Sequence, residues 1–103
     1  GDTAYGNHFG EIQEYYGEFE HCIMPIGAYK PEYCMEDAHI SPQYAVTAFN
    51  ALKAKHFIPM HYATYDLSDE PLGEPIRLMR DAQEQGLLEG DLHELAIGQE
   101  YLF

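Results

Sequence analysis

The sequence predicts an α/β fold of about three strands and three helices, arranged as an incomplete layered sandwich. Segments with the 3.6-residue period of amphipathic helices alternate along the chain with short apolar runs typical of buried strands. The length of 103 residues suits a single domain with a modest core. Hydrophobic residues make up 46% of the composition, which favours a globular chain over a disordered one.

The first predicted helix covers residues 7–16 and ends at Gly17, which is a suitable C-cap. Apolar residues recur three and four positions apart on one face of this helix: Phe9, Ile12 and Tyr16. The apolar run at residues 19–26 then predicts a buried strand, and Pro25 and Gly27 mark its end.

Residues 28–40 show no clean period and predict a long loop. A loop of this length without secondary structure is usually either functional or disordered. Because the segment is rich in side chains that line pockets, we interpret it as a candidate binding loop.

A second helix and strand follow this loop. Ser41 and Pro42 predict a helix start, since a hydroxyl residue caps the first turn and proline fits the first helical position. Apolar residues at helical spacing continue the helix: Ala45, Ala48, Phe49 and Leu52. Residues 56–61 predict a strand, in which Pro59 indicates either an edge strand or the strand's end.

The last helix is predicted to start at Glu74 and Pro75 and to continue to Gly86. Residues 92–97 alternate loosely and predict a strand or hairpin, followed by a turn at Gly98. Three side chains would share one face of that strand: His93, Leu95 and Ile97.

The charge of the chain excludes two classes of partner. Eighteen acidic residues against five basic ones give a formal net charge of −13. Nucleic-acid binding needs a basic stripe that neutralises phosphates, and these few basic residues are too dispersed to form one. An anionic membrane surface would repel the chain for the same reason.

The two cysteines, Cys22 and Cys34, form neither a disulfide framework nor the paired CxxC spacing of a structural zinc site. We therefore expect two ordinary thiols in a reducing compartment, and a cytoplasmic location for the protein.

Three residues are candidates for chemistry. Asp2 can present a carboxylate to a metal ion, although an aspartate before threonine is also a common turn or cap. His61 stands at the expected end of a strand, where α/β folds place ligands, and a hydrogen-bonded structural histidine is the alternative. His39 precedes a helix start and suits a general acid or base, a substrate contact or a plain loop histidine.

The remaining motifs are weak. Four histidines lack partners at metal-binding spacing and are predicted to be structural or surface residues: His8, His21, His56 and His93. The chain has no HxH, HxxxH or HExxH motif, and no Gly-x-Ser-x-Gly elbow of a serine hydrolase. Carboxylate pairs such as Glu36-Asp37 and Asp69-Glu70 are expected to lie in exposed loops.

Short motifs in a fixed order resemble the C-terminal half of bacterial proteins like N-acyl-phosphatidylethanolamine-hydrolysing phospholipase D, within the metallo-β-lactamase superfamily. They run over roughly residues 1–80. The motifs are Gly1–Tyr5, Pro25–Tyr29, Met35–His39 with Ser41-Pro42 and Ala45-Val46, Ile58–Tyr65, and Asp69–Leu72. Ala38 stands where the family has Gln, and His61–Tyr65 departs from the family's His-Trp-Gly-Thr-Phe. These departures bear on the lipid substrate more than on the metal site.

The resemblance implies that residues 1–103 are the C-terminal part of one metallo-β-lactamase αββα sandwich domain. It implies that Asp2 bridges two metal ions, usually zinc, that His61 is the last histidine ligand, and that His39 lies near the scissile group. Tyr29 and Tyr65 would line the substrate pocket. The family's His-x-His-x-Asp-His motif and its next histidine ligand belong to an N-terminal half that is absent here, so we expect activity only from the intact protein.

Two functions follow as hypotheses. In the first, a zinc-bound hydroxide attacks a phosphodiester, a phospholipid-like ester or a lactone, with the missing N-terminal half as the essential partner. In the second, the chain is a non-enzymatic α/β domain that binds a partner or forms a homo-oligomer, and Asp2 and His61 are structural. The two differ in whether Asp2 and His61 converge in space, since only metal binding gives them a reason to meet.

Overall fold

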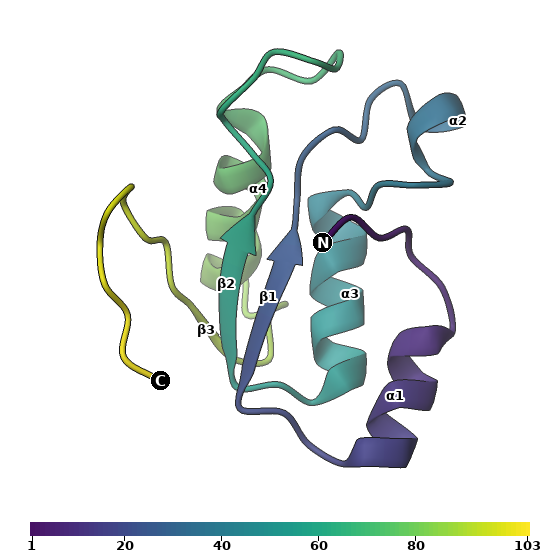
Figure 1. Cartoon of the computed structure of the whole chain (residues 1–103), viewed down its shortest axis with the longest axis vertical. Helices are drawn as coiled ribbons and strands as arrows, with labels where there is room; N and C mark the ends of the chain where they lie inside the picture. Colours follow the sequence, from purple (N-terminus) through teal and green to yellow (C-terminus); the bar gives the residue numbers. More distant parts are fainter.

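Three parallel strands form one sheet in the computed structural model, which describes residues 1–103. Their order in the sheet follows the sequence and comprises β1 (His21–Pro25), β2 (His56–Met60) and β3 (Asp91–Leu92). Parallel neighbours need a crossover connection, so a helix lies between each pair of strands along the chain. The predicted α/β class is confirmed (Figure 1).

Four helices accompany the sheet: α1 (His8–Tyr16), α2 (Glu32–Met35), α3 (Pro42–Leu52) and α4 (Glu74–Glu84). The start of α3 is as predicted, because the Ser41 side chain accepts a hydrogen bond from the backbone N–H of Tyr44 at 3.4 Å. Gly17 ends α1 at φ 86°, a conformation that glycine adopts freely. None of these helices has the length and apolarity that a membrane crossing requires.

The strand at Pro59 is the central one, so the edge-strand interpretation is wrong and the strand-end interpretation is confirmed. Pro59 is the second-last residue of β2 and pairs only with Met24 of β1. On the other side β3 reaches no further than Phe57, so no neighbour there requires an N–H from residue 59.

Three further predictions need correction. The strand predicted at residues 19–26 covers only His21–Pro25. The strand predicted at 92–97 is wrong, since β3 comprises Asp91–Leu92 and the pairing ends where the His93 N–H bonds the Phe57 carbonyl at 2.8 Å. The segment 28–40 contains the one-turn helix α2, which is too short to produce a helical period in the sequence.

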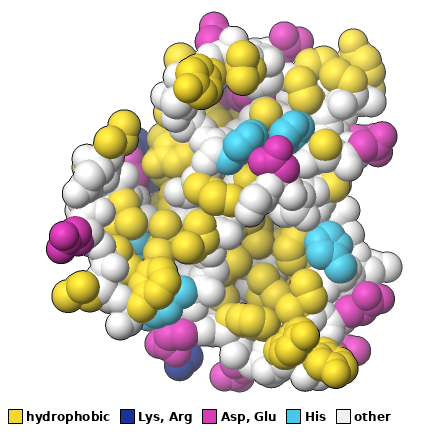
Figure 2. Space-filling model, viewed as in Figure 1, with side chains coloured by type: hydrophobic (Ala, Val, Ile, Leu, Met, Phe, Trp, Pro, Cys, Tyr) yellow, Lys and Arg dark blue, Asp and Glu magenta, His cyan; other side chains and the backbone are white.

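The core lies between one face of the sheet and helices α3 and α4. Ala45, Ala48 and Phe49 of α3 are fully buried, and the two alanines let the helix approach the strands closely. Phe57 of β2 packs against Phe49 with ring centroids 5.3 Å apart. The opposite face has no such cover: Ile23 of β1 is 53% exposed, and hydrophobic side chains gather over this side of the molecule (Figure 2).

We predict that Phe49→Ala lowers the free energy of unfolding by about 3–5 kcal/mol, because it empties the centre of the core. Urea denaturation of the complete gene product measures this change. Tyr16→Ala is the matched control, since Tyr16 is 71% exposed and its loss should cost less than about 0.5 kcal/mol. Equal losses for the two variants would contradict this description of the core.

Candidate metal centre

The carboxyl ends of β1 and β2 lie side by side because the two strands are parallel and in register from His21–His56 to Pro25–Met60. The Ile26 N–H continues the pairing with the Met60 carbonyl at 3.1 Å. His61 follows immediately and takes a left-handed conformation with φ 58°. The chain therefore turns sharply at the edge of the sheet where α/β folds place ligands.

Gly27 is required for this arrangement. A Cβ atom at position 27 would overlap the backbone carbonyl oxygen of His61, so only glycine lets the two chain segments approach this closely. The backbone that follows β1 thus lies directly against that of His61.

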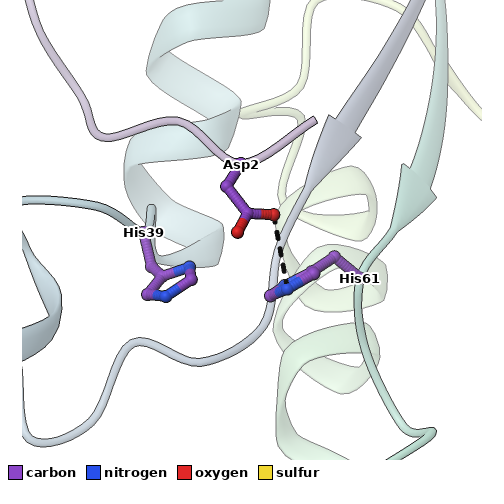
Figure 3. Close-up of side chains that lie close together, drawn as sticks. All are labelled: Asp2, His39 and His61. Atoms are coloured by element: carbon purple, nitrogen blue, oxygen red, sulfur yellow. Dashed lines mark ion pairs between the residues drawn. The ribbon is translucent and has the colours of Figure 1, made fainter.

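Asp2, His39 and His61 converge at this edge (Figure 3). The Asp2 carboxylate comes from the N-terminal segment, and its Oδ1 lies 3.4 Å from His61 Nε2. His39 comes from the turn before α3, and its ring stands 5.4 Å from that of His61, centroid to centroid, at 18°. One ligand atom from each of the three lies within 4.8 Å of the others.

These donors fit a zinc ion. Two ligands at tetrahedral zinc, with bonds of about 2.0–2.1 Å, stand about 3.3 Å apart, and Asp2 and His61 are at 3.4 Å. The buried Nδ1 of His39 has no hydrogen-bond partner in the protein, which is costly unless a ligand or cation completes it. Two nitrogens and one carboxylate are, however, too few donors for two zinc ions.

Two hollows flank the three residues. The larger, of about 740 Å³, is lined by Tyr29 and His39 among others. The smaller, of about 230 Å³, lies beside His61 and includes Tyr65. The structure thus places the two predicted pocket tyrosines in different hollows: Tyr29 in the one that includes His39, and Tyr65 in the one that includes His61.

The Tyr29 hydroxyl is already engaged with a carboxylate. It donates a hydrogen bond to Glu74 Oε1 at 2.6 Å, and Lys30 Nζ lies 2.9 Å from the same oxygen. Burial and this hydrogen bond to Glu74 raise the pKa of Tyr29 well above its usual value. Tyr29 is therefore a neutral wall of the hollow rather than a proton donor.

Glu70 is buried, contrary to the predicted exposed-loop role of Asp69-Glu70. Its Oε1 accepts backbone N–H bonds from Tyr29 and Lys30, both at 2.8 Å, and its Oε2 accepts the Ser68 hydroxyl. Burial opposes ionisation of Glu70, but these hydrogen bonds outweigh it and hold the carboxyl pKa below its usual value. The hydrogen bonds of Glu70 thus connect the segment after β1 to the loop before α4. The position of Glu70 in an acidic sequence pair does not indicate this role.

Three of the remaining histidines are also not isolated. His56 and His93 are predicted to lack partners. In the structure, one ligand atom from each of them lies within 4.8 Å of the other and of a carboxylate oxygen of Asp91, at the opposite edge of the sheet. Their neighbour His21 stacks on His56 with ring centroids 5.0 Å apart. Sequence spacing does not reveal this group, because parallel strands bring together residues that are far apart in the chain.

Comparison with known proteins agrees with the fold. Residues 1–62 match the family model described as "Beta-lactamase superfamily domain". The chain belongs to this metallo-β-lactamase superfamily, and the family resemblance seen in the sequence is confirmed.

Individual relatives support the same assignment. An uncharacterised protein of Mycobacterium tuberculosis is 33% identical over 87 residues, covering 82% of this chain and 23% of that protein. N-acyl-phosphatidylethanolamine-hydrolyzing phospholipase D 1 of Caenorhabditis elegans is 37% identical over 68 residues, or 65% of this chain and 19% of that protein. The mitochondrial phospholipase D of this type from Saccharomyces cerevisiae is 34% identical over 77 residues, covering 73% and 16%. The chain therefore spans about a quarter or less of these relatives.

A solved structure shares the fold. The metallo hydrolase from the hyperthermophilic archaeon Ignicoccus hospitalis superposes with a TM-score of 0.68 at 21% identity. The match covers 96% of this chain and 36% of that one, so the three strands and their helices correspond to part of a larger fold there.

We predict that Gly27→Ala weakens zinc binding by about tenfold or more, because the new methyl group displaces His61. Zinc titration of the complete gene product measures the affinity. Gly10→Ala is the matched control, since a Cβ at position 10 meets nothing within 4 Å. Unchanged affinity in Gly27→Ala would show that His61 does not bind zinc or tolerates the shift.

We predict that Glu70→Gln lowers the free energy of unfolding by about 1–3 kcal/mol at neutral pH. Because the folded pKa of Glu70 is depressed, its contribution is present above the unfolded value of about 4.3 and disappears as the pH falls through the folded pKa. The difference from wild type should therefore shrink in acid denaturation series below about pH 4. Glu84→Gln, at an exposed position on α4, controls for loss of a surface charge.

Proposed function

We propose that this chain is the C-terminal part of a metal-dependent hydrolase, with Asp2 and His61 as metal ligands. The convergence of Asp2, His39 and His61 carries the proposal: residues from three separate segments bring an oxygen and two nitrogens to the carboxyl edge of the sheet. Nothing in the packing of the core requires these polar side chains to meet.

Each residue has a distinct role in this proposal. The Asp2 carboxylate would bridge two ions, and His61 would hold one of them from the end of β2. His39 lines the larger hollow and would move a proton at the reacting group there. Zinc, when bound, supplies a Lewis acid and makes water a nucleophile at neutral pH.

Two zinc ions need more donors than this chain provides. The remaining ligands would come from the N-terminal half of the same fold, which would also cover the open face around Ile23. This chain spans about a quarter or less of the length of its relatives, which is consistent with such a larger protein.

The substrate class we propose is a phosphodiester, a phospholipid-like ester or a lactone. The nematode and yeast relatives, both named as hydrolysing N-acyl-phosphatidylethanolamine, support a phosphodiester. The hollow beside His39 offers Tyr29 and Tyr44 as amphipathic walls, which accommodate an acyl or aromatic group.

A non-enzymatic role is the alternative, and the exposed apolar face of the sheet is compatible with both functions. A partner protein or a second copy of the chain would bury this face just as effectively as an N-terminal half. Under this alternative Asp2 and His61 form only an exposed ion pair, which contributes little to stability.

We predict that Asp2→Asn and His61→Gln each lower the zinc content of this centre in the complete gene product and lower its phosphodiesterase turnover by at least about 100-fold. His39→Gln should keep the zinc and lower turnover by about 10²–10⁴-fold, since it removes only proton transfer. Elemental analysis gives the metal content, and hydrolysis of bis-p-nitrophenyl phosphate and of a neutral aryl lactone gives the rates.

The exposed His8 supplies the matched control, because His8→Gln removes an imidazole outside the site. Wild-type protein that binds zinc but hydrolyses neither probe would contradict the hydrolase. Full zinc content and turnover in both Asp2→Asn and His61→Gln would contradict the ligand assignment.

A further inference from the structure

We propose that the amino edge of the sheet carries a second, separate cation site, formed by His56, Asp91 and His93, that takes a divalent transition metal ion such as Zn²⁺. One ligand atom from each of these residues lies within 4.8 Å of the others. The site stands at the start of β2, whereas His61 follows its end. Five strand residues separate the two by about 16 Å, so one ion cannot serve both.

The donor atoms already face one another. His56 Nδ1 lies 2.9 Å from His93 Nε2 and 3.9 Å from Asp91 Oδ2. A tetrahedral zinc ion needs its ligands about 3.3 Å apart, so the two imidazoles must separate by only about 0.4 Å. Two imidazole nitrogens and one carboxylate oxygen form a donor set that suits zinc, cobalt or nickel better than calcium or magnesium.

A carboxylate lies near the second nitrogen of His56, slightly beyond hydrogen-bond distance. His56 Nε2 lies 3.8 Å from Glu20 Oε1, and Glu20 is held in turn by Lys55 Nζ at 3.0 Å. A carboxylate on the distal nitrogen fixes the tautomer of the ring and directs the lone pair of Nδ1 toward the ion. Glu20 is therefore a positioning residue, not a ligand.

The C-terminal segment closes the site. The Tyr101 hydroxyl lies 3.5 Å from His93 Nε2 and 3.3 Å from His21 Nε2, and the Phe103 ring stacks on His21 at 4.4 Å between centroids. A bound ion would lie close to this hydroxyl, because the hydroxyl is 3.5 Å from a proposed ligand atom of His93. The ion would thus hold β2 and β3 together beside the last residues of the chain.

Charge and access favour a cation here. Glu20 and Asp91 place two carboxylates around the histidines, and the Asp91 side chain is 71% exposed, so an ion can enter from solvent. The competing arrangement is a neutral hydrogen bond from one imidazole to the other, which leaves both carboxylates without a role at His56. The two arrangements differ in whether zinc binds.

The test uses the complete gene product carrying Asp2→Asn and His61→Gln, which disables the first site. Calorimetric zinc titration of this double variant should still show one ion per chain, and adding His93→Gln should abolish it. Adding Glu20→Gln should weaken the same binding by about 10–100-fold without abolishing it, as loss of a partner to a metal-bound histidine does. Zinc should raise the melting temperature of the double variant but not of the His93→Gln triple variant.

His8→Gln in the same background is the matched control and should leave the bound ion in place. If His93→Gln fails to fold, Asp91→Asn replaces it in the comparison, because Asp91 is exposed. The expected result for Asp91→Asn is a reduced affinity for zinc. Absence of zinc binding by the double variant, or binding that survives both His93→Gln and Asp91→Asn, overturns the proposal. Neither result depends on hydrolytic activity.

Discussion

The parallel pairing of β1 with β2 is the constraint on which the rest of the structure depends. Because both strands run in the same direction, the polar residues that follow them gather at one edge, and those that begin them gather at the other. His61 belongs to the first edge, while His21 and His56 lie opposite each other at the second. The pairing in turn requires α3 to cross over the sheet, and its fully buried alanines allow that helix to lie close to the strands.

The sequence predicts the elements whose signals are local. A serine cap with proline at the first helical position identifies α3, and β1 and β2 appear as apolar runs. The sequence signals fail for elements whose pairing partners are distant in the chain. β3 is only two residues long and exists because Phe57 pairs with it, and Pro59 is acceptable in a central strand because β3 ends before reaching it.

The same distinction applies to the polar residues. Residue type and position make Asp2, His39 and His61 weak candidates, and the family resemblance adds their roles. Only the folded chain brings their donor atoms together. Glu70 resembles any acidic loop residue until the backbone N–H groups of Tyr29 and Lys30 are seen to converge on it. Its burial could not be predicted, because the hydrogen bonds that compensate for burial come from a segment about forty positions away.

Charge restricts the chemistry that the carboxyl edge can perform. Most basic side chains are paired with acids: Lys30 with Glu74, Lys55 with Glu20, Arg77 with Asp81 and Arg80 with Glu94. The hollow beside His39 is instead lined by Glu32, Glu36 and Asp37, with Lys30 as its one cation. An anionic phosphodiester would be repelled from such a surface unless metal ions neutralise both the substrate and Asp2, whereas a neutral lactone would not. The ratio of phosphodiester to lactone hydrolysis should therefore fall when the metal site is only partly filled, because the charge of the ions, more than the shape of the hollow, admits the anion.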